Sequence, residues 1–337
     1  MTDLGQAAAS DDPAAMAGCQ VPDQYRAAVV LAADQRVFAG VSPSERDPRQ
    51  TLRVAHVPTP EPAHGEVLIA VMASSINYNT VWSAMFDPVS TFRFLNALGR
   101  ISDSGARHDQ PYHVVGSDAA GVVLRVGPGV TRWRPGQEIV THCLYTSLSD
   151  HAGHDDALRD PDQRAWGYET NFGGLAELAL VQATQLMPKP AHLTWEEAAC
   201  LNLTLSTAYR QLVSTHGAAM KQGDRVLIWG ACGGLGGYAT QLVLNGGGIP
   251  ICVVSSDEKA ALCRRRGAEL VINRKDFEFW DPDGNPRKRN WSRFRDAVRD
   301  LGGGDPEIVF EHPGRETFGV SVLTAARAGT IVTCAST

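Results

Sequence analysis

The sequence predicts an α/β protein with two domains, a β-rich first part and a second part built on a parallel sheet. Two observations carry this prediction. In the first part, short apolar runs alternate with turns rich in proline and glycine, which is typical of antiparallel strands. In the second part, short apolar runs alternate with helical stretches, which is typical of parallel strands joined by crossover helices. With 337 residues, 43% of them hydrophobic, the chain can bury the cores of two domains.

The β-rich part extends from about residue 25 to the helical stretch Trp195–Thr215. Its strands are predicted by the apolar runs Ala27–Leu31, Glu66–Met72, His113–Val126, Glu138–Thr141 and Leu178–Leu180. Together they indicate a barrel-like domain, which we assign to residues 25–205. Residues 1–24 have neither a basic start nor an apolar block, so we expect a disordered leader and no secretion signal.

The second domain is assigned to residues 206–337. Its strands are expected at 226–230, 249–255, 269–273, 307–311 and 330–335, with helices between them. Residues 274–292 are a polar, tryptophan-containing insertion after the third strand. We find no internal repeat.

The most informative segment is Val226–Val243, which predicts a strand, a glycine-rich turn and a helix. The glycines are Gly230, Gly233, Gly234 and Gly236. They remove Cβ atoms where a pyrophosphate must approach the backbone, and the helix directs free N–H groups at that anion. This predicts a Rossmann dinucleotide site, to which we also assign Leu235. The spacing departs from the strict fingerprint, and the alternative is a tight turn without a ligand.

The next strand ends in polar residues that bear on the choice of cofactor. An NAD site usually has an acidic residue there to hold the ribose 2′-hydroxyl. Here the strand ends in Ser255 and Ser256, with Lys259 one turn further on, which suits a 2′-phosphate and favours NADPH. Asp257 is the competing ribose ligand, and its alternative role is to cap the helix Glu258–Arg266.

The end of the second domain leaves two possibilities open. A six-stranded dinucleotide-binding sheet needs one more strand after 330–335, and the sequence stops at Thr337. We therefore expect either a five-stranded sheet or a truncated chain whose last strand is missing.

Charge and cysteine usage exclude several classes of protein. The net charge of −6 gives no electrostatic reason to bind nucleic acid or an anionic membrane. No apolar stretch approaches the 18 or so residues of a membrane span. The seven cysteines are scattered, without a Cys-x-x-Cys pair, so we expect no disulfide framework and a cytoplasmic location.

A block in the first domain resembles the signature of the medium-chain dehydrogenase/reductase superfamily, whose first domain is GroES-like. The block comprises Gly116–Gly127, Gly129-Val130 and Pro135–Val140. In zinc alcohol dehydrogenases it opens with Gly-His-Glu, whereas this chain has Ser117 and Asp118, and it lacks the four-cysteine zinc loop. The resemblance therefore implies a zinc-independent reductase. We expect no metal, although His142, Cys143, His151 and His154 cluster in the sequence.

Within that superfamily the chain resembles the crotonyl-CoA carboxylase/reductases from about residue 25 to its end. Besides the glycine-rich turn, the segments that carry the resemblance are Ser74–Trp82, Pro111–Asp118, Trp166–Glu177, Ser206–Ser214 and Phe310–Thr317. It implies NADPH hydride transfer to the β-carbon of an α,β-unsaturated acyl-CoA and attack of the enolate on CO2, giving an alkylmalonyl-CoA. It also implies a homo-oligomer. We further assign His312 to the cofactor site.

The resemblance implies a CO2 pocket made by an asparagine, a phenylalanine, a glutamate and a late histidine. The asparagine matches Asn79, a donor to a CO2 oxygen, whose alternative role is a cap or turn. The glutamate matches Glu169, expected to position a water or the histidine, and otherwise a surface carboxylate. Tyr168 replaces the phenylalanine, and its hydroxyl could admit water or supply a proton. The chain stops before the late histidine, and His312 lies at a different position.

Three hypotheses follow. The leading one is reductive carboxylation of an enoyl-CoA, with acyl-CoA and CO2 as partners. The second is reduction of an enoyl thioester with protonation of the enolate, which Tyr168 and the absent histidine favour. The third is a truncated, non-catalytic remnant that binds nucleotide.

Overall fold

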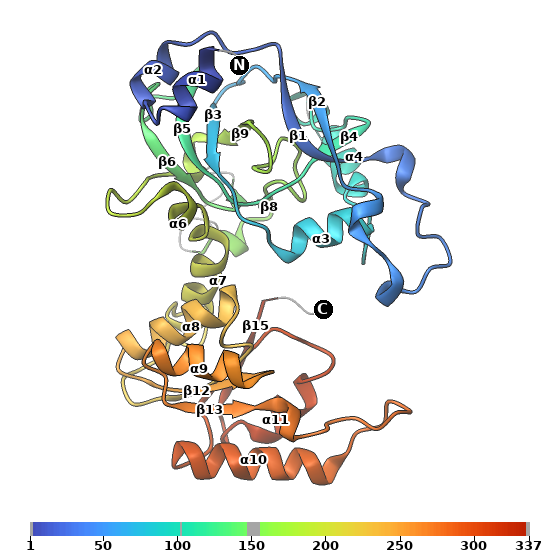
Figure 1. The fold of residues 1–337 in the computed structure, drawn as a ribbon, viewed down its shortest axis with the longest axis vertical. Helices are drawn as coiled ribbons and strands as arrows, with labels where there is room; N and C mark the ends of the chain where they lie inside the picture. Colours follow the sequence, from blue (N-terminus) through green and yellow to red (C-terminus); the bar gives the residue numbers. More distant parts are fainter. Residues whose placement is uncertain (1–2, 102, 147–155, 335–337) are drawn as a thin grey trace. The chain divides into compact units, whose positions relative to one another are not determined.

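The computed structural model describes residues 3–101, 103–146 and 156–334. The chain divides into two compact units, residues 1–203 and 204–337, two residues before the boundary expected from the sequence. Figure 1 shows the first unit in blue to yellow-green and the second in yellow to red.

The first unit is built on antiparallel sheets, which confirms the β-rich domain. The strand order is β2-β1-β4 in one sheet, β10-β6-β5-β3-β9 in the second and β7-β8 in a short ribbon. The strands are β1 Gln24–Leu31, β2 Arg53–Pro58, β3 Glu66–Ala73, β4 Tyr112–Val114, β5 Ala120–Val126, β6 Glu138–Thr141, β7 Leu144–Tyr145, β8 Arg164–Ala165, β9 Leu178–Gln182 and β10 Leu186–Pro188. The helices are α1 Asp3–Ala9, α2 Pro13–Gly18, α3 Tyr78–Met85, α4 Phe92–Gly99, α5 Asp103–Ala106 and α6 Trp195–Ala199.

Strand β3 lies inside the five-stranded sheet and packs on both faces. Leu68 and Ala70 belong to one buried cluster, whereas Val67 and Ile69 belong to another. This alternation follows from the two-residue period of a strand, which sends successive side chains to opposite faces. The nearly continuous apolar run in the sequence therefore reflects a strand covered on both sides.

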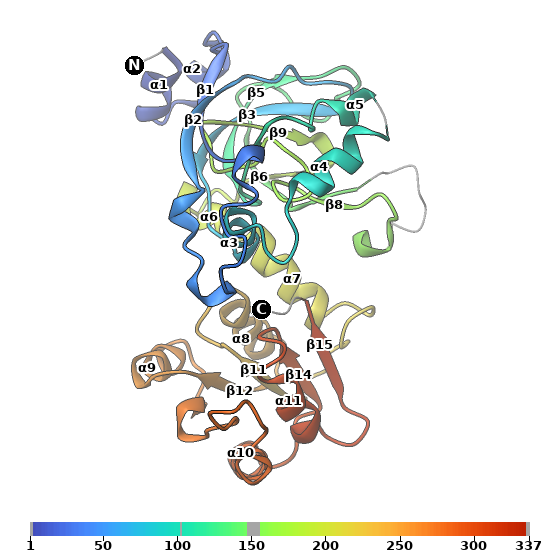
Figure 2. The same ribbon diagram turned by 90° about the vertical axis from the view of Figure 1, so that its right-hand side faces the viewer.

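The expectation of a disordered leader is wrong for residues 3–18. They form α1 and α2, which lie side by side in Figure 2. Asp12 caps α2 by accepting a hydrogen bond from the Ala15 N–H at 2.9 Å, and the Met16 side chain is fully buried in the core beside β5. The indole N–H of Trp195 donates to Asp11 at 2.7 Å. A few apolar side chains and one good cap suffice because the rest of the unit supplies the surface they cover.

Two other expectations need correction. The run His113–Val126 is two strands, β4 and β5, because the backbone leaves the sheet at Gly116, whose φ is +110°. The helical stretch Trp195–Thr215 is also two helices, α6 and α7 Asn202–Leu212. Cys200 ends α6, and a side chain from another loop caps the start of α7, as described below.

The second unit is a parallel sheet with the strand order β13-β12-β11-β14-β15, which confirms the Rossmann fold. Its strands are β11 Arg225–Trp229, β12 Ile249–Val254, β13 Leu270–Asn273, β14 Ile308–Glu311 and β15 Thr330–Thr333. Its helices are α8 Gly234–Asn245, α9 Asp257–Arg265, α10 Lys288–Gly302 and α11 Phe318–Thr324. The described residues thus form a five-stranded sheet.

Helices cover both faces of this sheet. Helices α8 and α9 pack on the side of Val226 and Ile228, and α10 and α11 pack on the side of Leu227 and Trp229, on opposite faces in Figure 1. The carboxyl ends of β11 and β12, where an open α/β sheet binds its ligands, carry the glycine-rich turn and the Ser255–Lys259 segment.

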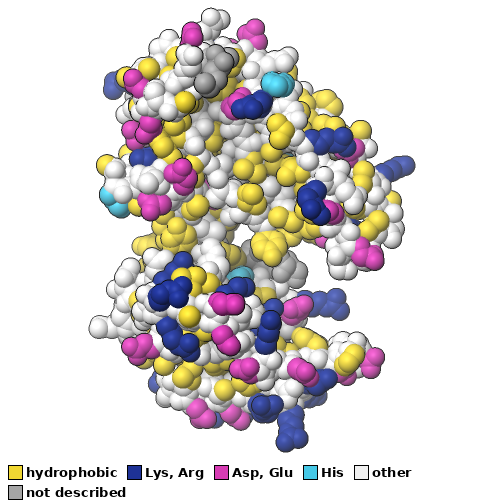
Figure 3. Space-filling model, in the orientation of Figure 1, with side chains coloured by type: hydrophobic (Ala, Val, Ile, Leu, Met, Phe, Trp, Pro, Cys, Tyr) yellow, Lys and Arg dark blue, Asp and Glu magenta, His cyan; other side chains and the backbone are white. Residues whose placement is uncertain are grey.

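The described residues contain no candidate membrane-spanning helix. None of their helices combines the length and apolar character that a span requires. On the face drawn in Figure 3, basic and acidic side chains of the second unit are interspersed.

Candidate active site

Asn79 lies in the first turn of α3, directly after the loop that follows β3. Its side-chain amide donates a hydrogen bond to the Ser117 hydroxyl at 2.5 Å, and its Oδ1 accepts from the N–H of Thr80 at 3.1 Å. The side chain is half-buried. An amide nitrogen carries two hydrogens, so one donor remains after the bond to Ser117.

Asp118 is almost completely buried, and every group that contacts its carboxylate donates to it. The Ser75 hydroxyl donates at 2.7 Å and the Asn77 amide at 2.8 Å to one oxygen, and the N–H of Leu203 donates at 2.9 Å to the other. Burial raises the pKa of Asp118 to about 6, while these three hydrogen bonds act to lower it. Asp118, which stands in place of the glutamate of the Gly-His-Glu block, is therefore a hydrogen-bonded anchor.

The loop that carries Tyr168 and Glu169 stacks on the backbone at Gly116. A Cβ atom on Gly167 would lie 1.9 Å from the carbonyl oxygen of Gly116, and one on Gly173 would lie 2.5 Å from the same atom. The N–H of Gly174 donates to that oxygen at 2.9 Å. The close approach therefore requires glycine, and it places the loop against the segment that holds Ser117.

Within this loop, Glu169 and Tyr168 have different surroundings. Glu169 Oε2 accepts a hydrogen bond from the N–H of Ala165 at 2.7 Å, so the carboxylate braces its own turn. The Tyr168 ring lies 5.7 Å from the ring of Phe94, centroid to centroid. Burial, followed by the charges of Glu169 and Asp87, raises the pKa of the Tyr168 hydroxyl.

The structure thus brings the three expected catalytic residues to one backbone stretch, 116–118. Asn79 reaches it through Ser117, and Tyr168 and Glu169 reach it through the glycine stack. Among the described contacts, no hydrogen bond joins Asn79 directly to either of the other two. The expected role of Glu169 toward a water or a histidine stays a prediction.

The glycines of the cofactor turn divide into two kinds. Gly230 has φ +58° and accepts from the N–H of Gly233 at 2.9 Å, and a Cβ on Gly236 would lie 2.3 Å from the Gly230 oxygen. The turn itself therefore requires Gly230 and Gly236. In contrast, Gly233 and Gly234 are exposed and present open backbone, with Leu235 half-buried behind them. This is the cradle that a pyrophosphate needs at the start of α8.

His312 lies beside this turn. Its Nε2 is 2.8 Å from the carbonyl oxygen of Trp229, so Nε2 carries the hydrogen. Burial lowers the pKa of His312, which keeps the ring neutral. The ring also lies 3.0 Å from where a Gly230 Cβ would be, so the histidine fills the space that the glycine leaves.

The residues after β12 form a small polar group suited to a phosphate. The Lys259 ammonium donates to the Ser255 hydroxyl at 3.1 Å, and both can face a bound anion. Ser256 is the N-cap of α9 and accepts from the N–H of Lys259 at 3.3 Å. Asp257 is therefore not the cap. It is the first residue of α9 and accepts from the Asn273 amide at 3.1 Å.

The cluster of possible metal ligands is only partly described. His151 and His154 lie outside the described residues. His142 Nδ1 accepts from the N–H of Leu144 at 3.1 Å, and burial lowers its pKa. In the described part of the chain, no group of three or more His, Cys, Asp or Glu side chains could hold a metal.

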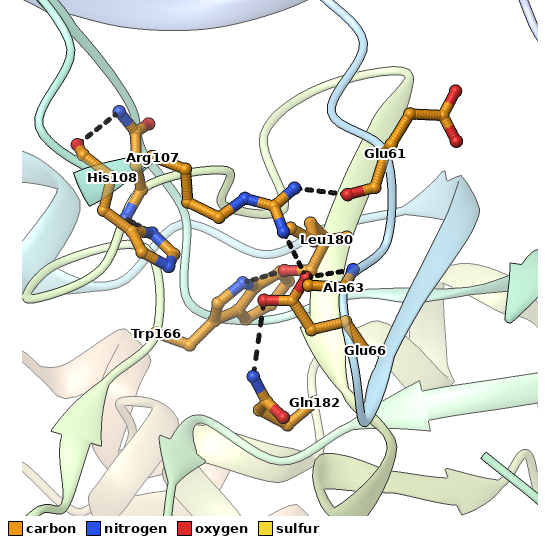
Figure 4. Close-up of polar contacts among 9 residues, drawn as sticks. Glu61, Ala63, Glu66, Arg107, His108, Trp166, Leu180 and Gln182 are labelled. Atoms are coloured by element: carbon orange, nitrogen blue, oxygen red, sulfur yellow. Dashed lines mark hydrogen bonds and ion pairs between the residues drawn. The ribbon is translucent and has the colours of Figure 1, made fainter. Parts of the chain in front are cut away.

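Sequence reasoning missed an ion pair at the start of β3 between a buried glutamate and a half-buried arginine, drawn in Figure 4. The Arg107 guanidinium lies 2.6 Å from the Glu66 carboxylate and also donates to the carbonyl oxygen of Glu61. Burial raises the pKa of Glu66, against the effects of the Ala63 N–H and Arg107. A cavity of about 470 Å³ adjoins the pair. A charged residue opening an apolar strand was the available signal.

Comparisons with known proteins agree with this geometry. Residues 63–191 match the family model of the alcohol dehydrogenase GroES-like domain. Crotonyl-CoA reductase of Streptomyces avermitilis is 57% identical over 335 residues, which cover 98% of this chain and 75% of that protein. Crotonyl-CoA carboxylase/reductase of Cereibacter sphaeroides is 42% identical over 301 residues, covering 86% and 67%.

Solved structures extend the likeness to the fold. The structure of the 2-octenoyl-CoA carboxylase reductase CinF in complex with NADP and 2-octenoyl-CoA matches with a TM-score of 0.94 and 53% identity. The match covers 99% of this chain and 76% of that one. The chain belongs to the crotonyl-CoA carboxylase/reductase family of the medium-chain dehydrogenase/reductase superfamily.

Proposed function

We propose that this chain reduces the double bond of an α,β-unsaturated acyl-CoA with NADPH and carboxylates the resulting enolate. The observation that carries the proposal is the Asn79 amide, held by Ser117 beside a fully hydrogen-bonded Asp118. The names of the relatives and the bound ligands of CinF point to the same substrate class.

The cofactor half of the proposal rests on the second unit. Gly233 and Gly234 offer exposed backbone for the pyrophosphate, and Ser255 with Lys259 offers two donors for a 2′-phosphate. These residues fit NADPH better than NADH. NAD sites usually have a carboxylate at this strand end, which would repel the extra phosphate, whereas this chain has serines and a lysine there. NADPH, when bound, supplies the hydride.

The chemistry then asks the first unit to control an enolate. As the β-carbon gains a hydride, the electron pair of the C=C bond moves toward the thioester oxygen, giving the enolate. The α-carbon next forms a bond to the carbon of CO2, and a C–O π pair moves onto oxygen to give a carboxylate. Asn79 has one amide hydrogen left after its bond to Ser117, and we assign that hydrogen to a CO2 oxygen.

A second candidate function is simple reduction, in which the α-carbon takes a proton instead of CO2. Tyr168 favours this outcome. Its hydroxyl is protonated at neutral pH, as in any tyrosine, and it can hold a water or supply the proton, although the raised pKa makes it a weaker acid than an exposed tyrosine. Which product dominates therefore depends on the balance between Asn79 and Tyr168.

Following NADPH oxidation with crotonyl-CoA, with and without bicarbonate and carbonic anhydrase, tests the proposal, provided that the products are identified by mass. Ethylmalonyl-CoA that depends on bicarbonate is the expected product. Butyryl-CoA alone would leave the simple reductase. No turnover from folded protein would favour the hypothesis of a non-catalytic remnant.

We also infer a homo-oligomer and a cytoplasmic location. Exposed apolar side chains on α11, namely Phe318, Val322 and Leu323, support an assembly, as does β15 at the edge of the sheet. The seven cysteines are scattered along the sequence without a Cys-x-x-Cys pair, which supports a reducing compartment. Light scattering should give a mass above that of one chain.

A further inference from the structure

We propose that Asp118 is a positioning residue that fixes Asn79 and thereby sets how much of the enolate is carboxylated rather than protonated. The inference rests on the proposed function and deepens it. Asp118 itself is buried, with 1% of its surface exposed, so it acts through the groups that it holds and not by touching CO2.

The first step concerns the start of α3. Asn77 occupies the N-cap position of this helix, where an asparagine normally accepts a hydrogen bond from the helix backbone. Its side chain makes no such bond and instead donates to Asp118 at 2.8 Å. The helix thus forgoes a stabilising cap, and its first turn, which contains Asn79, is located by the carboxylate.

The second step concerns the loop before α3. Ser75 donates to the Asp118 carboxylate at 2.7 Å, and Ser74 donates to the Asp118 backbone carbonyl at 2.7 Å. The three polar side chains of the loop 74–77 are therefore fixed to one residue, and the remaining residue, Ile76, is exposed. Asp118 holds the loop from both its side chain and its backbone.

The third step is the link to Ser117. Ser117 is the neighbour of Asp118 in the chain, is itself fully buried, and accepts the Asn79 amide. Asp118 thus holds Asn79 from two directions, through Asn77 on the same helix and through Ser117 on the facing segment. While both of these contacts are intact, they fix the direction of the remaining amide hydrogen of Asn79.

The other carboxylate oxygen connects this anchor to α7. It accepts from the N–H of Leu203 in the first turn of that helix, where a negative charge is favourable. Burial, followed by the charge of Asp118, raises the pKa of the neighbouring Cys200 thiol. A neutral amide at position 118 would lack this charge, and its NH2 group would face either the Ser75 and Asn77 donors or the N–H of Leu203, so at least one hydrogen bond would be lost.

The test compares product ratios. Asp118→Asn, Ser117→Ala and the double variant are each supplied with crotonyl-CoA, NADPH and bicarbonate, and the ratio of carboxylated to reduced product is measured by mass. Glu66→Gln is the matched control, because Glu66 is also a buried carboxylate of the first unit but is tied to Arg107 (Figure 4). Partial unfolding lowers the rate of both products together, so the ratio reports on positioning alone.

We expect Asp118→Asn to lower the ratio about tenfold, the effect of losing one hydrogen bond to a charged group. Ser117→Ala should lower it too, and the double variant should fall no further than the larger single effect, because both act through Asn79. Glu66→Gln should leave the ratio unchanged.

An unchanged ratio in Asp118→Asn, an equal fall in Glu66→Gln, or single effects that simply multiply would each overturn the inference. The product of the wild-type chain separates this failure from that of the proposed function. If the wild type gives only reduced product, the proposed function fails and the role of Asp118 in carboxylation fails with it. If it gives carboxylated product, the variants decide the role of Asp118.

Discussion

Two glycines of the cofactor turn, Gly233 and Gly236, respond differently to an added methyl group. In Gly236→Ala, the new Cβ would lie 2.3 Å from the Gly230 oxygen and 2.7 Å from the Ala231 Cα, both backbone atoms that cannot turn aside. In Gly233→Ala, the nearest atom is 3.3 Å away and the backbone has φ −78°, which alanine adopts freely. Gly236→Ala should therefore destabilise the turn, whereas Gly233→Ala should weaken only the binding of a ligand to the turn.

The expected magnitudes differ accordingly. Overpacking of this kind costs about 1–3 kcal/mol, so Gly236→Ala should lower the melting temperature by about 5–10 °C. Gly233→Ala should change stability by less than about 1 kcal/mol. Its methyl group covers an N–H that a phosphate would use, and a hydrogen bond to a charged group is worth about 1.5–3 kcal/mol. NADPH should therefore bind about ten- to a hundredfold more weakly.

Thermal melting without cofactor and fluorescence titration with NADPH measure the two effects separately. Gly237→Ala is the matched control, since it adds the same methyl to the same helix, where it meets the flexible Arg266 guanidinium at 3.2 Å and the Ala231 oxygen at an ordinary contact distance of 3.9 Å. It should lower neither stability nor affinity. Unchanged NADPH affinity in Gly233→Ala would refute the assignment of this turn as the pyrophosphate site.

Three further predictions concern the cofactor, the product and pH. Lys259→Ala should lower kcat/KM for NADPH by up to about tenfold, since Lys259 is exposed, and leave the value for NADH unchanged; an equal loss with both cofactors would argue against a 2′-phosphate contact. Tyr168→Phe should raise the ratio of carboxylated to reduced product by about fivefold, the value of one hydrogen bond, and an unchanged ratio would exclude its hydroxyl from the competition. Burial lowers the pKa of His108 and His113 to about 4 each. As the pH falls below about 6.5, the unfolded chain therefore binds protons at these histidines before the folded chain does. Each histidine then lowers the free energy of unfolding by about 1.4 kcal/mol per pH unit, down to about pH 4. Asp118, whose pKa burial raises to about 6, acts in the opposite sense below that pH. Removing the contribution of His113 should therefore make the urea midpoint of His113→Gln fall less between pH 6 and pH 4 than that of the unsubstituted chain, and an equal fall would contradict the burial of His113 as a neutral ring.

The strands of the second unit were predictable because each is a short apolar run bounded by turn residues. Strand β12, for example, lies within one residue of its expected bounds. The prediction of a disordered leader was wrong because it rested on overall composition. Its composition is poor in large apolar residues, yet Asp12-Pro13 is a helix-start signal and Met16 lies on the face that it orients. The local helix-start signal therefore describes this segment better than its overall composition does.

The site was only partly predictable. Sequence patterns can mark Ser117 and Asp118 as replacements for the His-Glu pair of zinc alcohol dehydrogenases, but they cannot show that three donors from two segments converge on the carboxylate. Likewise, the glycine pattern predicts the cofactor turn but does not separate the glycines that shape it from those that are open to a ligand. Contacts between distant segments decide both points.

The stacking of Gly167 and Gly173 on Gly116 limits how this protein can be redesigned. The contacts in this stack are mostly between main-chain atoms, so no side chain can be shortened to relieve a clash with the Gly116 carbonyl. Any larger residue at these three positions would push the two loops apart and carry Ser117 and Tyr168 with them. Libraries aimed at new substrates should therefore leave these positions fixed and vary exposed side chains such as Ile76 and Tyr78, which can change volume without moving the frame.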